Sequence, residues 1–386
     1  MSGLPRPLGL PDFPWDTLAA ARKQANGYRE GIVDLSVGTP VDPTPATVQK
    51  ALREAADAPG YPPVVGTGQV KQSIHQWMRH RGMIELSDDA VIPTTGSKEM
   101  VAWLPKLIGV RPGDKVLYPE VAYPTYHVSA VLAGAEPVPV NPYDLSTWPD
   151  DAAFVWLNSP SNPTGEVMSA EWTQICVQWA RERGTVIVAD ECYAELPWSP
   201  RYQKSGVPSL LWPAVCDDDA RGLAVLYSLS KQSNMAGYRG AVMVGDQNLV
   251  SAVVEGRKHS GLMTPAPVQA AIAVGLNDWT HIHDQSARYG RRRAALLRAV
   301  ETTGLIPYER TEAGLYLWLS ASEDFDFEET DLVAPNRGRA LVQWFARRGI
   351  LVAPGDFYGE KSVDFVRVAL TATDESIEKA CIRLSA

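Results

Sequence analysis

Five short apolar runs, separated by longer amphipathic segments, are the feature that most constrains the fold of this chain. KVLYP (115–119), AAFVWLN (152–158), TVIVAD (185–190), LAVLYS (223–228) and GAVMVG (240–245) have the length and composition of buried strands. Helical patterns lie between them, as in residues 169–184, where Ser169 and Gly184 are suited to cap the two ends. Apolar strands that alternate with helices predict an α/β fold with a mostly parallel sheet covered on both faces.

The pattern changes after about residue 285. A basic helical run (286–304) leads to three further predicted strands, at 314–320, 350–355 and 364–370, which suggest a smaller α+β unit. At 386 residues the chain is also longer than a single hydrophobic core usually supports. We therefore expect a large domain over residues 46–285 and a small domain formed by residues 1–45 and 286–386.

Composition excludes several classes of partner. The net charge of −9 argues against a nucleic acid or an anionic membrane as the main partner, and no segment has the apolar length of a membrane span. The first residues are interrupted by prolines and lack the apolar stretch of a signal peptide. The four cysteines are scattered without a CxxC pair, and the HxH at 281–283 has no companion ligands, so we expect a cytoplasmic protein with reduced thiols and no metal.

Polar residues follow the predicted strands, at the edge where α/β proteins bind ligands. In TTGSKEM (94–100), Gly96 and Ser97 would open a helix and offer backbone N–H groups to a phosphate, although an ordinary helix cap has the same sequence. The GxxxxGK[ST] spacing of a nucleotide-binding P-loop is absent. NSPSNPTG (158–165) predicts a turn, which would also hold the Asn162 amide in a fixed orientation.

Two further strand ends carry ionisable groups. ADECY (189–193) places Asp190 behind an apolar run, where a buried carboxylate needs a partner, with Tyr193 close by. In SLSKQSNMAGYRG (228–240), Ser228, Ser230 and Arg239 could bind a phosphate, and a partly desolvated Lys231 could form an imine with a carbonyl compound. Taken singly, Lys231 could equally be a solvated surface charge. Together these groups are what pyridoxal phosphate requires.

With these motifs in this order, the chain resembles the class I/II (fold-type I) pyridoxal-phosphate aminotransferases over nearly its whole length. SLSKQSNMAGYRG is similar to the family's lysine motif, and SNPTG, DECY and FVRVAL (365–370) support the likeness. The resemblance implies a large domain with a mostly parallel seven-stranded sheet, a smaller α+β domain and a homodimer with shared active sites. It also implies amino-acid and 2-oxo-acid substrates.

The resemblance carries residue roles to matching positions of this sequence. Lys231 matches the lysine that bonds to the cofactor and shuttles the proton, and Asp190 matches the carboxylate that pairs with the pyridine nitrogen. Asn162 and Tyr193 match the donors to the phenolate oxygen, and Tyr123 matches the aromatic residue stacked on the ring. The residues implied to hold the phosphate are Gly96, Ser97, Lys98, Ser228, Ser230, Arg239 and, from the neighbouring subunit, Tyr61. Those implied to bind the substrate carboxylate are Gly38, Asn162 and Arg367.

Residues 10–45 and 60–82 are similar to actinobacterial succinyldiaminopimelate aminotransferases of lysine and cell-wall biosynthesis. This resemblance implies glutamate as donor and N-succinyl-2-amino-6-oxopimelate as acceptor. An aminotransferase for aspartate or another amino acid, or a pyridoxal-phosphate β-lyase, stays open as an alternative. The Gln, His and Arg cluster at 72–81 and the pair Arg257-Lys258 could contribute to binding the acceptor, but we interpret both as solvated helix faces.

Overall fold

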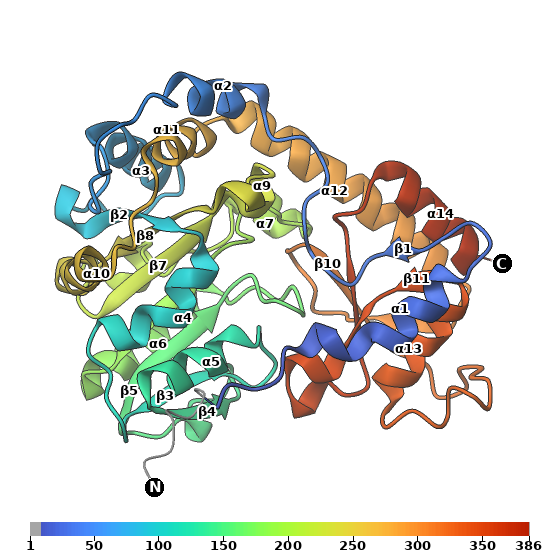
Figure 1. Ribbon diagram of the computed structural model, residues 1–386. Helices are drawn as coiled ribbons and strands as arrows, with labels where there is room; N and C mark the ends of the chain where they lie inside the picture. The colour runs from blue at the N-terminus through green and yellow to red at the C-terminus, as the bar shows by residue number, and fades with distance from the viewer. Residues whose placement is uncertain (1–8, 386) are drawn as a thin grey trace, which may run out of the picture.

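The computed structural model describes residues 9–385. They form a large unit built on one central sheet and a smaller unit beside it, and the long helix α12 (Trp279–Val300) runs from one to the other (Figure 1). Along the described residues, no helix combines the length and the apolarity needed to span a membrane.

The central sheet has seven strands in the order β2-β8-β7-β6-β5-β3-β4. Strand β8 is antiparallel to both of its neighbours, while the other adjacent pairs are parallel. This confirms the predicted mostly parallel α/β fold. Four of the predicted strands match the observed ones in full, and β6 begins one residue later than predicted. The bounds are β2 Val91–Thr95, β3 Lys115–Pro119, β4 Glu136–Val140, β5 Ala152–Asn158, β6 Val186–Asp190, β7 Leu223–Ser228 and β8 Gly240–Gly245.

Strand β4 was not among the predicted strands, because two prolines interrupt its sequence, EPVPV. Proline cannot donate a hydrogen bond to a neighbouring strand, so it is confined to sheet edges. Strand β4 lies at an edge of the sheet and pairs only with β3. Its position therefore explains how a proline-rich segment can be a strand.

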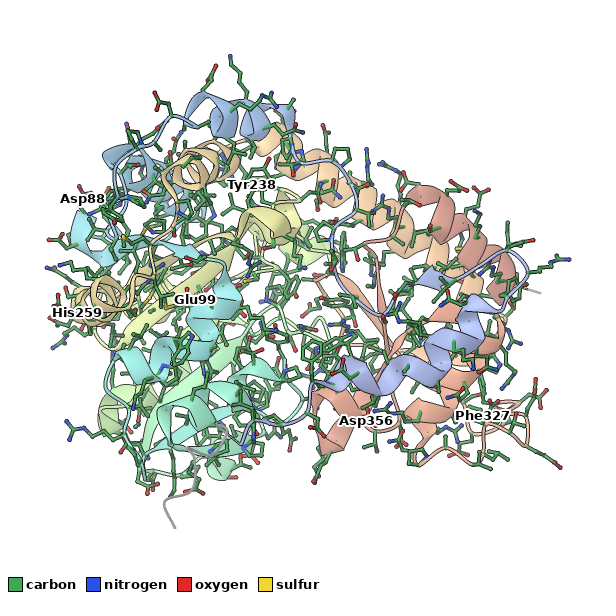
Figure 2. The ribbon with its side chains drawn as sticks, in the orientation of Figure 1. Asp88, Glu99, Tyr238, His259, Phe327 and Asp356 are labelled. Atoms are coloured by element: carbon green, nitrogen blue, oxygen red, sulfur yellow. The ribbon has the colours of Figure 1, made fainter. Side chains whose placement is uncertain are left out.

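Both faces of the sheet are covered by helices, and side chains fill the space between them (Figure 2). This explains the unbroken apolarity of the strands. In β5, Phe154 and Trp156 belong to a buried cluster with α4 (Ser97–Leu107), α5 (Thr125–Ala133) and α10 (Gln247–Ser260). The alternate residues Val155 and Leu157 face the opposite cluster. The helices that contribute to that second cluster include α3 (Gly68–His80), α6 (Ala170–Arg183), α7 (Pro200–Ser205), α8 (Pro213–Cys216) and α11 (Ala266–Gly275).

Helix α6 has the ends that its sequence predicts. The Ser169 Oγ accepts a hydrogen bond from the Trp172 N–H at 3.1 Å, which satisfies one of the free donors at the helix start. Gly184 ends the helix with a left-handed φ of 68°, a conformation that glycine adopts without steric cost.

The smaller unit contains an antiparallel sheet in the order β12-β13-β10-β9 and a separate parallel pair, β1 with β11. Leu18, Ala21 and Ala25 from the N-terminal part share a buried cluster with Leu341 and Phe345 from the C-terminal part. The elements of this unit are α1 Ala19–Asn26, β1 Val33–Asp34, β9 Leu305–Pro307, β10 Tyr316–Ala321, α13 Arg337–Arg347, β11 Ile350–Leu351, β12 Ala353–Pro354, β13 Val366–Ala369 and α14 Asp374–Leu384. Helix α2 (Ala46–Glu54) packs on α11 of the large unit.

The prediction of one strand over residues 350–355 was wrong. The chain forms β11, which pairs with β1, and then leaves that pair at Val352 to form β12 in the other sheet. Strand β12 is an edge strand, which accommodates Pro354. Local apolarity identified the segment as extended but carried no information on its partners.

Helix α12 is continuous through residue 285 and begins seven residues before the basic run predicted at 286–304. The Asp278 carboxylate caps its first turn by accepting from the His281 N–H at 3.1 Å. The domain bounds at residues 46 and 285 stay a prediction. Residues 1–8 and 386 of the predicted small domain lie outside the described part of the chain.

Candidate active site

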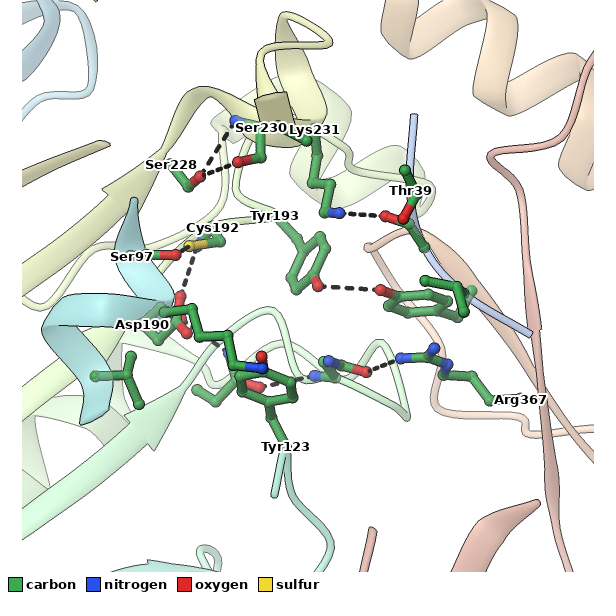
Figure 3. A pocket seen from close by; sticks show the side chains of 18 of the residues that line it. Thr39, Ser97, Tyr123, Asp190, Cys192, Tyr193, Ser228, Ser230, Lys231 and Arg367 are labelled. Atoms are coloured by element: carbon green, nitrogen blue, oxygen red, sulfur yellow. Dashed lines mark hydrogen bonds between the residues drawn. The ribbon is translucent and has the colours of Figure 1, made fainter. Parts of the chain in front are cut away.

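A cavity of about 490 Å³ opens at the carboxyl ends of the central strands, next to the smaller unit. Strands β5 and β6 end in register at Asn158 and Asp190, and β7 ends at Ser228, so their polar last residues meet at one edge (Figure 3). Sequence-predicted residues that line the cavity are Gly38, Ser97, Lys98, Tyr123, Asn162, Asp190, Tyr193, Ser228, Ser230, Lys231, Arg239 and Arg367.

Lys231 lies in α9 (Leu229–Gln232), and its Nζ donates to the Gly38 carbonyl within the cavity. Burial lowers the pKa of this amine, and the positive charges of Arg367 and Arg239 act in the same direction. The amine therefore loses its proton more readily than a surface lysine does. This environment suits a nucleophile and does not match a solvated surface charge.

Asp190 is a buried carboxylate, with the residue only 6% exposed. It forms no ion pair with any residue that the structure describes. Its Oδ2 accepts from the Tyr126 hydroxyl at 2.9 Å and its Oδ1 from the Cys192 N–H at 3.2 Å. Burial raises the pKa of Asp190, while these two hydrogen bonds oppose the rise. A carboxylate held in this way lacks a cation, and a protonated ring nitrogen in the cavity fits that need.

One side of the cavity is arranged as an anion cradle. Gly96 precedes α4 with a φ of 80°, and a Cβ at this position would lie 2.3 Å from Arg239 Nη2, so only glycine lets the guanidinium approach. The Ser228 Oγ donates to the Ser230 Oγ at 2.9 Å and accepts from the Ser230 N–H at 3.1 Å. The N-terminal turn of α4, two hydroxyls and a guanidinium together fit the phosphate of pyridoxal phosphate.

Arg367, on β13, is 2% exposed and has no carboxylate partner among residues 9–385. Its Nη1 donates to Asn162 Oδ1 at 3.0 Å and its Nη2 to the Ser36 carbonyl at 2.9 Å, while its buried Nε has no hydrogen-bond partner in the described chain. The guanidinium carbon lies 3.9 Å from the ring centroid of Tyr316. A buried cation of this kind is suited to bind an anion.

The loop that carries Asn162 is fixed by Asn158, a residue that the sequence analysis did not assign to the site. The Asn158 Oδ1 accepts from the Asn162 N–H at 2.7 Å, and the Asn158 Nδ2 donates to the carbonyls of Asp190 at 3.0 Å and Pro160 at 3.1 Å. These bonds give the predicted turn its rigidity. Because the Asn162 oxygen is bonded to Arg367, its amide NH₂ remains for a ligand.

Two tyrosines of the site were also missed. Tyr316 lies on β10, and its hydroxyl is 3.3 Å from that of Tyr193, close to Gly38. Tyr126, in the first turn of α5, comes three residues after Tyr123 and contacts it edge to face, with the ring centroids 5.9 Å apart. The i, i+3 spacing in YPTY could have indicated Tyr126, whereas Tyr316 had no local signal, because it belongs to a strand of the other unit. Further lining residues from the N-terminal part are Phe13, Trp15, Arg22, Val37 and Thr39.

Several predicted residues lie elsewhere. Tyr61 is 94% exposed and does not line the cavity. The residues at 72–81 and the pair Arg257-Lys258 do not line the cavity either. Their interpretation as solvated helix faces was wrong for Arg81 and for Arg257. Arg81 is buried and donates to the Val207 carbonyl at 3.1 Å, and Arg257 is fully buried and donates to the Pro93 carbonyl at 2.8 Å.

Comparisons with known proteins agree with this geometry. The family model of aminotransferase class I and II matches residues 30–384. A probable aminotransferase of Mycobacterium tuberculosis is 46% identical, over 97% of this chain and 85% of that protein. The 4-dedimethylamino-4-oxo-anhydrotetracycline transaminase OxyQ of Streptomyces rimosus is 45% identical, over 97% of this chain and 99% of that protein.

Among solved structures, a probable N-succinyldiaminopimelate aminotransferase from Thermus thermophilus is similar with a TM-score of 0.82 and 26% identity, over 97% of this chain and 99% of that one. The match of the family model covers most of the chain, and the two relatives share nearly half of its residues. The chain therefore belongs to the class I and II aminotransferases, a family of pyridoxal-phosphate-dependent enzymes.

Proposed function

We propose that this aminotransferase transfers the amino group of glutamate to N-succinyl-2-amino-6-oxopimelate, the succinyldiaminopimelate aminotransferase reaction of diaminopimelate and lysine biosynthesis. The observation that carries the proposal is the buried, unneutralised Arg367 in the same cavity as Lys231. An α-carboxylate bound to Arg367 would present the neighbouring amino or oxo carbon to the lysine. The name of the Thermus thermophilus protein supports the choice of acceptor.

We assign the binding of the substrate α-carboxylate to Arg367 and Asn162. The Nε of Arg367 and the unused N–H bonds of its Nη atoms can donate to two carboxylate oxygens, a paired contact that fixes direction as well as position. Tyr316 supports the guanidinium from below with its ring face. Gly38 lies against the Tyr316 hydroxyl, where a Cβ would clash, and leaves room for the substrate.

Bound pyridoxal phosphate supplies an aldehyde carbon for the amino group and a ring that accepts the electrons released when the α-proton leaves. Lys231 Nζ, with its lowered pKa, takes that proton from the substrate Cα. The Asp190 carboxylate holds a proton on the ring nitrogen, and the hydroxyl of Tyr193 and the amide of Asn162 are assigned as donors to the ring oxygen. Gly96, Ser97, Lys98, Ser228, Ser230 and Arg239 are assigned to the phosphate.

The succinylated acceptor carries three carboxylates, so it needs further positive groups besides Arg367. Arg22 lines the same cavity as a further cation, and its Nη1 also pairs with Asp34 Oδ2 at 2.8 Å, whereas Lys98 is assigned to the phosphate. Lys98 lies between the rings of Phe13 and Tyr123, with its Nζ 5.7 and 5.9 Å from their centroids. The guanidinium of Arg22 supports an acceptor that carries more carboxylates than Arg367 alone can bind.

The OxyQ relative favours a second candidate. Its name describes an oxo derivative of anhydrotetracycline, and it matches this chain with 45% identity over 99% of its own length. An acceptor of fused rings would use the aromatic side chains of the cavity, such as Trp15 and Tyr123, more than its cations.

The two candidates are separated by the two half-reactions. The holoenzyme is first incubated with single amino acids, and conversion of the cofactor to its amino form is followed by visible absorbance. Each oxo acceptor is then added to the amino form, and the recovery of the original spectrum is measured. We expect glutamate to drive the first step and the succinylated oxo acid to restore the spectrum fastest. Failure of glutamate, or faster recovery with a fused-ring ketone, would refute the first candidate. Ammonia release without an acceptor would indicate a lyase.

We further propose that the enzyme is a cytoplasmic homodimer in which Tyr61 contacts the cofactor phosphate of the neighbouring subunit. Tyr61 is almost fully exposed, and Val65, four residues later, is exposed as well. Large exposed apolar side chains that lie near one another can mark an interface between subunits, which supports the proposal. Sedimentation of the holoenzyme should give twice the chain mass, and Tyr61→Phe should weaken cofactor retention without changing that mass. A monomer with full activity would contradict the proposal.

A further inference from the structure

Residues 36–44, which we call the strap, pass along the cavity without forming a helix or strand. Val37, Gly38 and Thr39 line the cavity, and the Gly38 carbonyl accepts from Lys231. The Ser36 carbonyl accepts from Arg367 Nη2 at 2.9 Å. The strap therefore contacts both of the residues to which the proposed function assigns the central roles.

Apolar burial does not hold the strap in place. Within residues 37–44 only Gly38 is buried, and Val37 and Val41 are 41% and 50% exposed. A segment with so little buried surface gains little from the hydrophobic effect, so its conformation depends on polar contacts.

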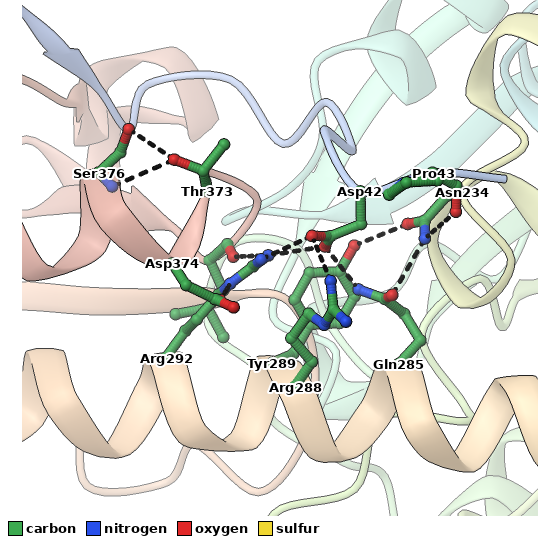
Figure 4. Close-up of polar contacts among 11 residues, drawn as sticks. Asp42, Pro43, Asn234, Gln285, Arg288, Tyr289, Arg292, Thr373, Asp374 and Ser376 are labelled. Atoms are coloured by element: carbon green, nitrogen blue, oxygen red, sulfur yellow. Dashed lines mark hydrogen bonds and ion pairs between the residues drawn. The ribbon is translucent and has the colours of Figure 1, made fainter.

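The strongest of these contacts converge on Asp42 (Figure 4). Its carboxylate accepts two hydrogen bonds from Arg292, at 2.7 and 2.8 Å, and one each from Arg288 and Gln285, both at 2.9 Å. The side chains of Asp42 and Arg292 are only 7% and 3% exposed. Burial alone would raise the pKa of Asp42, but the hydrogen bonds from Arg292, Gln285 and Arg288 outweigh it and lower the pKa. The carboxylate is therefore a buried anion with a complete set of donors, all on one face of α12.

The same cluster reaches residues 229–234, which include the short helix α9 and which we call the Lys231 loop. Gln285 Oε1 accepts from Asn234 Nδ2 at 3.0 Å, and the Tyr289 hydroxyl donates to Asn234 Oδ1 at 3.3 Å. The Thr44 hydroxyl donates to the Asn234 carbonyl at 2.9 Å. Asn234 follows Lys231 by three residues and has a left-handed φ of 51°, which asparagine tolerates better than most residues. Helix α12 thus contacts both the strap and the Lys231 loop through one set of side chains.

We propose that Asp42 is a positioning residue, which through Arg292 and Gln285 fixes the strap against the Lys231 loop so that Gly38 faces both the lysine and the bound carboxylate. The inference rests on the proposed roles of Lys231 and Arg367 but not on the identity of the amino acceptor. It concerns contacts that span about 250 residues of sequence, since Asp42 and Arg292 are that far apart.

The test compares Asp42→Asn with Asp374→Asn in the holoenzyme. Asp374 is the other carboxylate on Arg292: it accepts from the Nε at 2.6 Å, but it is 67% exposed and does not touch the strap. Each substitution removes the negative charge of one carboxylate that contacts Arg292. A purely structural role of Arg292 between α12 and α14 would make the two variants alike.

Two quantities are measured for each variant. One is KM and kcat for the amino donor that converts the holoenzyme in the half-reaction; the other is hydrogen–deuterium exchange of the amides in residues 37–44. For Asp42→Asn we expect KM to rise about tenfold, a typical coupling between contacting groups, with a smaller change in kcat and faster exchange in the strap. For Asp374→Asn we expect both quantities to match the parent enzyme.

The proposal is overturned if Asp42→Asn leaves KM and strap exchange unchanged, or if Asp374→Asn changes them as much. Should Asp42→Asn not fold, Gln285→Met replaces it, because methionine keeps the volume of glutamine but breaks the link from Asp42 to Asn234. We expect this variant to show the same faster exchange and higher KM, and unchanged values would again overturn the proposal. The exchange measurement needs no substrate, so failure of the proposed acceptor and failure of this inference give different results.

Discussion

Replacing Arg367 by lysine removes the shape of the guanidinium while keeping its charge. In the structure two guanidinium N–H bonds already go to Asn162 and Ser36, which leaves Nε and the remaining hydrogens for a carboxylate. A lysine ammonium has three donors on one atom, and the same two oxygens compete for them. The variant should therefore lose at least one charge-assisted hydrogen bond to the substrate, worth about 1.5–3 kcal/mol. This corresponds to a fall of about tenfold to about 150-fold in kcat/KM.

The assay is steady-state turnover with the amino donor identified in the half-reaction, together with the spectrum of the bound cofactor. We expect most of the loss in KM, because the removed contact is made in the ground state as well as in the transition state. The cofactor spectrum should be retained, since Arg367 is not assigned to the cofactor.

Arg383→Lys is the matched control. Arg383 is also buried, its guanidinium carbon lies 4.3 Å from the ring centroid of Tyr28, and its Nη1 donates to the Gly349 carbonyl at 2.9 Å, but it does not line the cavity. This variant should lose stability and keep KM within about twofold of the parent. The assignment of Arg367 is refuted if its lysine variant keeps kcat/KM within about threefold of the parent, or if the Arg383 variant shows an equal rise in KM.

Three further substitutions test other parts of the site. Lys231→Ala should abolish turnover and the visible absorbance of covalently held cofactor; retention of both would contradict its role. Burial raises the pKa of Asp190, so the folded apoenzyme should lose stability as pH rises above 3.8 through that raised pKa. Asp190→Asn should remove this loss, measured by thermal unfolding as a function of pH, and should abolish activity. Identical pH profiles of stability for the variant and the parent would contradict the reasoning. Gly96→Ala would force a Cβ to 2.3 Å from Arg239 and should weaken cofactor binding in equilibrium dialysis by at least about tenfold, whereas Gly68→Ala, with open space around its Cβ, should not; equal binding by the two variants would exclude the cradle.

The sequence was informative wherever a structural feature depends on residues close together. The apolar runs at 115–119, 152–158 and 223–228 became strands with those bounds, and Ser169 and Gly184 capped the helix between them. Hydrophobic periodicity and capping are local properties, so they can be identified without knowledge of the fold.

It was less informative where a feature depends on pairing. Residues 350–355 are apolar throughout, yet they divide between two sheets, because the partners β1 and β13 come from distant parts of the chain. The prolines of β4 concealed a strand that only its place at the sheet edge makes possible. In both cases the deciding contacts are absent from the local sequence.

For the site, the motifs alone established which chemical groups are present and in which order, from Gly96 through Asn162 and Asp190 to Lys231 and Arg367. The protonation and contacts of these groups depend on the folded structure. Three features arise from burial against other elements: the lowered pKa of the Lys231 amine, the hydrogen bond from Tyr126 to Asp190, and the contact of the Arg367 guanidinium with the Tyr316 ring. Among residues 9–385, neither Asp190 nor Arg367 has an oppositely charged partner. Desolvation and hydrogen bonding act through space, so a group's protonation and reactivity follow from what the fold packs around it and not from its neighbours in the chain.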